Sequence, residues 1–91
     1  MSTPTSIDYE KALDLIRAGQ WNDAHELVQT AEGTPLADWL HGILHLQEGD
    51  LGNAGYWYRR AGRPFESHGS VAQELDAFEA SFDAGSRDRT S

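Results

Sequence analysis

The feature that most constrains the fold of this chain is an internal repeat at an offset of thirty residues. Both copies read glycine, a large residue, an alanine, a second large residue and a second alanine. These positions are Gly19, Trp21, Ala24, Val28 and Ala31 in the first copy, and Gly49, Leu51, Ala54, Tyr58 and Ala61 in the second. Glycine permits a tight turn, and a small alanine lets the helix that follows approach the helix before it. The repeat therefore predicts two antiparallel helix hairpins.

Helical periodicity and end signals extend this prediction to five helices and no strand. Apolar residues recur at helical spacing, and the alternation typical of half-buried strands does not occur. We expect helices over residues 6–18, 21–32, 35–48, 51–61 and 71–84. The signals for helix starts are a Thr5–Asp8 capping box, Thr34 before Pro35, Asp50, and a Ser70–Gln73 capping box. The signals for helix ends are Gly19, Gly33, Gly49, Gly62 and Gly85. Residues 6–85 are expected to form one domain between flexible tails, residues 1–5 and 86–91.

The repeat resembles the tetratricopeptide repeat, a family of stacked helix hairpins. The resemblance covers roughly Asp8 to Pro64 and implies an all-α fold of two stacked hairpins. The last helix, with its apolar stripe from Val71 to Phe82, would then be the C-terminal cap. The run from Asp38 to Arg63 also resembles small bacterial proteins, which implies no activity.

Charge and composition narrow the range of functions. The chain has 15 acidic and 7 basic residues, a formal charge of −8, which argues against binding to nucleic acid or to anionic membranes. The lack of cysteine excludes disulfides and cysteine-based metal sites. No apolar run is long enough for a signal peptide or a membrane span, so a cytoplasmic protein is expected. No phosphate-binding loop or nucleophile elbow occurs, so no catalytic residues are predicted.

The repeat architecture favours a protein- or peptide-binding scaffold over an enzyme. In stacked hairpins the first helices line a concave surface that commonly binds peptides. The expected lining residues are Tyr9, Leu13, Ile16, Trp39, Ile43 and Leu46. The partner would be a peptide, another protein or a second copy of the chain. Alternatively, these six residues form the core beneath the last helix.

Polar residues on one side of the third expected helix form a second candidate site. Asp38, His41 and His45 fall within about 60° of arc on that helix, and His25 on the helix before it could come close. One hypothesis is a hydrogen-bonded network without a metal or cofactor, in which Tyr58, Asn53 or Asp38 pairs with His45. The alternative is a small metal- or ligand-binding protein or enzyme, because histidines four residues apart can bind zinc.

The fourth expected helix carries a block of aromatic and basic residues over residues 56–60. Trp57 and Tyr58 are expected to be buried, whereas Tyr56 and Arg60 lie one turn apart on another side. Together with Arg59 and Arg63 they could bind a small anion or carboxylate. The alternative is that these arginines are counter-ions for the acidic helices.

Overall fold

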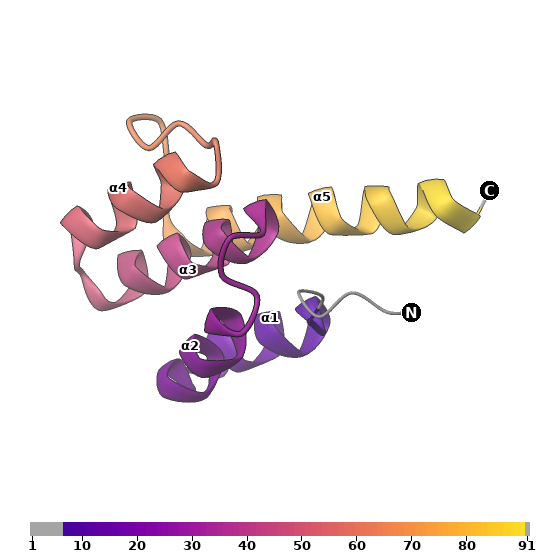
Figure 1. Ribbon diagram of the computed structural model, residues 1–91, viewed down its shortest axis with the longest axis horizontal. Coiled ribbons are helices and arrows are strands. Elements are labelled where there is room, and N and C mark those ends of the chain that lie inside the picture. The colour runs from indigo at the N-terminus through magenta and orange to yellow at the C-terminus, as the bar shows by residue number, and fades with distance from the viewer. Residues whose placement is uncertain (1–6, 91) are drawn as a thin grey trace.

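The computed structural model describes residues 7–90 and the side chains of residues 7–81. Five helices make up this part of the chain, and it contains no strand, which confirms the all-α class (Figure 1). They are α1 (Tyr9–Arg17), α2 (Trp21–Gln29), α3 (Pro35–Glu48), α4 (Leu51–Arg60) and α5 (Val71–Thr90). Helix α1 packs on α2 and α3 packs on α4, while α3 also contacts α2 and α5.

Several helix ends match the sequence signals. Helix α3 has Pro35 in its first turn, and at the start of α5 the Ser70 amide donates to Gln73 Oε1 while the Gln73 amide donates to Ser70 Oγ. The side chain of Asp50 caps α4 by accepting a hydrogen bond from the Asn53 amide. These ends confirm that capping chemistry sets the helix boundaries here.

Three predicted helix ends are wrong. Helix α1 begins at Tyr9, because Asp8 is itself the N-cap and accepts from the Lys11 amide at 3.1 Å. Its expected partner Thr5 and the expected tail 1–5 lie outside the described residues. Helix α2 ends at Gln29, before a turn in which the Thr30 hydroxyl donates to the Leu27 carbonyl. Helix α5 continues through Gly85 to Thr90, since a single glycine weakens a helix by only about 1 kcal/mol.

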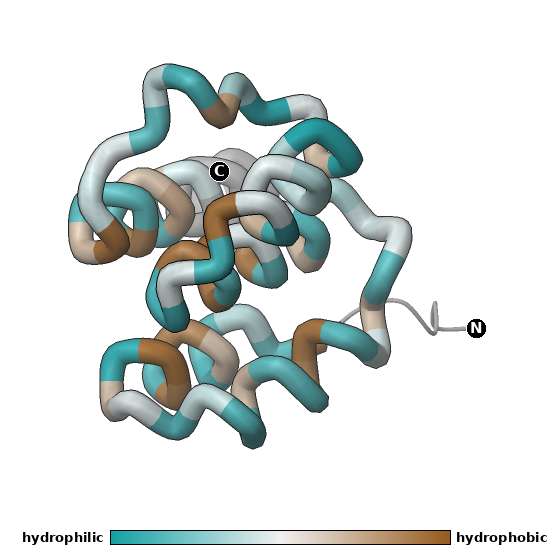
Figure 2. Tube along the Cα trace, turned by 90° about the vertical axis from the view of Figure 1, so that its left-hand side faces the viewer, coloured by the Kyte–Doolittle hydropathy of each residue, from teal (hydrophilic) through white to brown (hydrophobic). Residues whose placement is uncertain are grey.

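Helix α3 is the central helix of the molecule. All nine residues from Ala37 to His45 are buried, because α2, α4 and α5 pack around it. Hydrophobic and hydrophilic segments alternate along the surrounding chain, as expected for amphipathic helices that turn one face inward (Figure 2).

Helix α5 fills the face that was predicted to be an open groove. The Phe78 ring lies 5.7 Å from that of Tyr9 and 5.1 Å from that of Trp39, measured between ring centres. Five of the six expected lining residues are buried, with Trp39 only 2% exposed and Ile43 fully buried, and Leu46 is partly buried. The prediction of an open groove on this face is therefore wrong, because α5 covers α1 and α3.

The contact between α3 and α4 depends on a residue without a side chain. A Cβ atom added at Gly42 would lie 2.5 Å from Tyr58 Cδ1 and 3.2 Å from the Ala54 carbonyl oxygen. Tyr58 is fully packed and cannot move aside easily. Gly42 thus sets the distance at which the two helices pack.

A partly buried hydrogen-bond network attaches α5 to the other helices. Glu74 Oε1 accepts from the Tyr58 hydroxyl at 2.6 Å and from Trp39 Nε1 at 3.4 Å, while Oε2 accepts from the Gly69 amide at 2.9 Å. Burial raises the pKa of Tyr58, and the hydrogen bond to Glu74 raises it further. Burial acts to raise the pKa of Glu74, but its three donors outweigh burial and lower it.

We expect Gly42→Ala to lower the free energy of unfolding by about 1–3 kcal/mol, because the new methyl group overlaps the Tyr58 ring. Gly52→Ala is the matched control, since a Cβ there meets only the Asp50 side chain at 4.0 Å. The control should leave stability unchanged or raise it by up to about 1 kcal/mol. Urea denaturation measures both, and equal effects would contradict the close approach.

We expect Tyr58→Phe to destabilise the protein by about 1.5–3 kcal/mol, because it removes a hydrogen bond to a carboxylate. Tyr56→Phe is the control, since the exposed Tyr56 hydroxyl accepts from Arg60, which is also exposed. Its effect should stay below about 0.5 kcal/mol. Denaturation curves that coincide for the two variants would show that the Tyr58–Glu74 bond contributes no net stability.

Candidate functional site

Three histidines from two helices converge between α2 and α3. His25 comes from α2, and His41 and His45 come from successive turns of α3. Each offers one ring nitrogen to a group whose members all lie within 4.8 Å of one another. The Nε2 atoms of His25 and His41 are only 2.9 Å apart. We call these three residues the histidine cluster.

Two tryptophans form walls of the histidine cluster. Trp21 stacks on His25 at 4.6 Å, and Trp57 from α4 stacks on His41 at 3.9 Å, measured between ring centres. Trp21 Nε1 also donates to the carbonyl of Leu44 at 2.7 Å, which ties α2 to α3. The imidazole planes are thus held by packing as well as by hydrogen bonds.

Burial favours the neutral form of two of the imidazoles. It is the main cause that lowers the pKa of His41 to about 3, with further lowering by His25, His45 and Arg60. Burial and the neighbouring His45 also lower the pKa of His25. A neutral imidazole has a free electron pair on one ring nitrogen, so it can bind a metal ion without first losing a proton.

The Nδ1 atoms of His45 and His41 differ in their hydrogen-bond partners. His45 Nδ1 lies 2.8 Å from Glu48 Oε2, an arrangement that orients the ring and directs Nε2 away from the carboxylate. His41 Nδ1 is buried and has no hydrogen-bond partner among the described residues. The protein therefore leaves one hydrogen-bonding atom of His41 without a partner. A buried polar atom without a partner lowers the free energy of unfolding.

Asp38 does not join the histidine cluster, contrary to the prediction. Its Oδ1 accepts from the Gly33 amide at 3.0 Å, and its Oδ2 lies 3.7 Å from Arg60 Nε. The predicted network around His45 is also wrong, because Tyr58 donates to Glu74 and the Asn53 side chain donates to Asp50. His45 pairs instead with Glu48.

The arginines of residues 56–63 face different neighbours. Arg60 donates to the Tyr56 hydroxyl at 3.1 Å, lies over the Trp57 ring and faces Asp38. Arg63 stacks over Trp39, with its guanidinium carbon 3.5 Å from the ring centre. Arg59 is exposed beside Gly55. Arg60 thus acts as a counter-ion for the buried Asp38, as the alternative interpretation expected.

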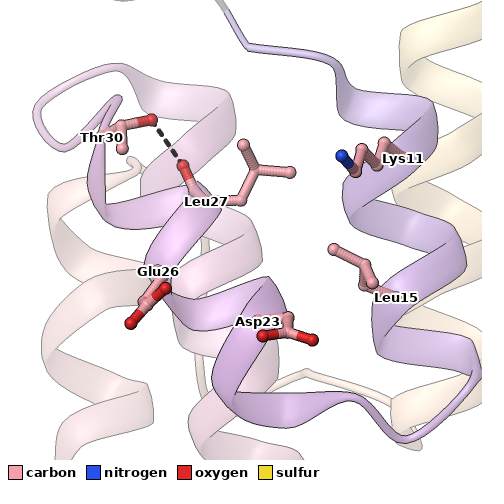
Figure 3. A pocket seen from close by; sticks show the side chains of 6 residues that line it. All are labelled: Lys11, Leu15, Asp23, Glu26, Leu27 and Thr30. Carbon is pink, nitrogen blue, oxygen red and sulfur yellow. Dashed lines mark hydrogen bonds between the residues drawn. The ribbon is translucent and has the colours of Figure 1, made fainter.

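A groove between α1 and α2 lies on the outer surface, with a volume of about 420 Å³ (Figure 3). Lys11 and Leu15 line it from α1, opposite Leu27 and Asp23 of α2. It is lined by Lys11, Leu15, Asp23, Glu26, Leu27 and Thr30. The sequence did not indicate this groove, because Leu15 and Leu27 occupy positions that are typical of the core of a helix hairpin.

Comparison of the chain with protein families, with curated proteins and with solved structures finds no match. Among the described residues, no helix has the length and apolar character needed to cross a membrane. The chemistry of the histidine cluster is therefore the main guide to function.

The metal-free protein should lose stability as the pH falls below about 6.5. Because the folded-state pKa of His41 is about 3 and its ordinary value is 6.5, the unfolded chain binds more protons between these values. His41 alone then contributes a slope of up to about 1.4 kcal/mol per pH unit. Urea denaturation with EDTA between pH 7.5 and 5 measures this slope.

His41→Phe should flatten this pH dependence, because phenylalanine keeps a ring against Trp57 but takes up no proton. His68→Gln is the control, since His68 lies outside the histidine cluster and bonds to the Gly69 carbonyl. The control should keep the wild-type slope. Equal slopes in the wild type and His41→Phe would contradict the lowered pKa.

Proposed function

We propose that this chain is a small helical protein that binds one divalent transition-metal ion, with Zn²⁺ as the reference metal, through His25, His41 and His45. The observation that carries the proposal is the convergence of three ring nitrogens within 4.8 Å. Asp38, which the sequence also placed near this site, is no ligand here because it is engaged with Gly33 and Arg60.

The ligand type selects the class of metal. Imidazole suits zinc, copper and nickel, whereas magnesium and calcium prefer oxygen ligands. Zinc binds histidine nitrogen at about 2.0–2.1 Å, so tetrahedral ligands lie roughly 3.3 Å apart. The 2.9 Å between His25 and His41 needs to lengthen by only a few tenths of an ångström. The chain contains no cysteine to compete for the ion.

A metal ion also fits the proton balance of the histidine cluster. The short contact between His25 and His41 requires one of the two Nε2 atoms to carry a proton and the other to accept it. A divalent ion takes the place of that single shared proton and accepts electron pairs from both nitrogens. The displaced proton moves to Nδ1 of the same ring, so this pair releases no proton near neutral pH, and metal binding weakens only when the pH falls far enough to protonate the rings.

The test is a calorimetric titration of the protein, purified without a histidine tag, with ZnCl₂ at pH 7.5. We expect one ion per chain and an affinity that falls at least tenfold in both His25→Gln and His45→Leu. Saturation at about 100 times Kd should stabilise the wild type by about 2.7 kcal/mol. For a domain of this size that corresponds to roughly 10 °C or more in melting temperature.

His68→Gln is the matched control, because it removes the fourth histidine of the chain without touching the cluster. It should bind zinc as the wild type does. His45→Leu should fold normally, since the repeat has Leu15 at the equivalent position. Binding that survives unchanged in both cluster variants, or no binding in the wild type, would refute the proposal.

The scaffold function predicted from the repeat is a second proposal, favoured by the groove between α1 and α2. Leu15 and Leu27 offer apolar contacts beside charges of both signs, which suits a short peptide or a second copy of the chain. Tetratricopeptide-like stacking of the hairpins, with α5 as the cap, and a cytoplasmic location belong to this proposal. A dimer in sedimentation that Leu27→Glu abolishes would support the second copy as partner, and a strict monomer would exclude it.

A further inference from the structure

We infer that the metal ion held by the histidine cluster keeps one coordination position for a small exchangeable ligand, namely water, hydroxide or a small anion. This inference rests on the proposed metal-binding function. Zinc sites with three protein ligands and one solvent position are typical of chemistry at the metal, whereas closed four-ligand sites are typical of structural zinc.

Three nearby carboxylates are engaged elsewhere, and a fourth, that of Glu26, lines the groove between α1 and α2. Glu48 accepts from His45 Nδ1, and Asp38 pairs with Gly33 and Arg60. Asp50 caps α4 and accepts from the Asn53 amide and side chain. Among residues 7–81, three imidazole nitrogens are thus the donors that converge on this point, and a tetrahedral ion takes its fourth donor from solvent.

The burial pattern shows from which side solvent reaches the ion. His41 is 3% exposed beneath Trp57, and His45 is 8% exposed. His25 is only half-buried, although Trp21 covers one face of its ring. The exchangeable position therefore lies on the His25 side, where a small ligand can enter while larger ones meet the two tryptophans.

Charge balance determines the kind of ligand. Imidazole binds a metal ion as a neutral ligand, so three of them leave the two positive charges of the ion uncompensated. Glu48 supplies one negative charge through His45, which makes it a positioning residue for that ring. The remaining positive charge favours hydroxide or a small anion over a neutral ligand.

Cobalt substitution with azide tests the inference. Co²⁺ in a site of low coordination number absorbs visible light, and a change of ligand shifts and intensifies that absorption. We expect saturable azide binding in the wild type and in His68→Gln. A cobalt spectrum that azide leaves unchanged would overturn the inference, because the protein would then complete the coordination. A visible spectrum that never forms, or that forms unchanged in His25→Gln and His45→Leu, would instead refute the proposed function.

The variant Glu48→Gln tests whether Glu48 orients the His45 ring or is itself a ligand of the metal ion. Loss of the outer carboxylate should weaken Co²⁺ binding about 10–100-fold. It should also tighten azide binding several-fold, because one negative charge near the ion is removed, an effect that a merely structural role would not produce. If azide acts on Glu48→Gln and not on the wild type, Glu48 is itself the fourth ligand and the inference is wrong.

Discussion

The burial of α3 on every side is the constraint on which the rest of the structure depends. Nine consecutive residues, Ala37 to His45, are buried because three other helices surround them. Burying a helix so completely in a chain of 91 residues requires close helix approaches. Gly42 provides one with α4, and Phe78 of α5 fills the space beside Trp39. The positions of all the polar groups follow from this arrangement.

Three polar residues of α3 meet that burial in different ways. Asp38 is satisfied by the Gly33 amide and Arg60, and His45 is satisfied by Glu48. His41 keeps one buried nitrogen without a partner and has a pKa far below its ordinary value. An apolar residue at this position would carry no such cost. Exceptions to the rules of protein stability are expected mainly at functional sites. His41 is such an exception, because its buried nitrogen lacks a partner, and it lies beside two other histidines.

The sequence predicted those parts of the fold that depend on local chemistry. The Ser70–Gln73 capping box, Pro35 and the cap at Asp50 each operate within a few residues, and the structure confirms them. It could not predict where α5 docks, because the same apolar stripe at Tyr9, Trp39 and Ile43 is compatible with an open groove and with a covered core. That placement depends on Phe78 and on the Glu74 network, contacts between residues more than fifteen positions apart.

The same distinction between local and long-range contacts explains which part of the candidate site the sequence predicted. Spacing along one helix correctly grouped His41 with His45, but it also included Asp38, which lies one turn earlier and faces Arg60. The short contact to His25 depends on how α2 packs against α3, and the Trp21 bond to the Leu44 carbonyl holds that packing.

A metal ion in the histidine cluster would join α2 of one hairpin to α3 of the other. Its binding energy would therefore act on the contact between the hairpins and not within either one. A net charge of −8 also favours the approach of cations at low ionic strength. Protons compete for the same nitrogens, so acid would weaken the metal site and the fold through one group of residues.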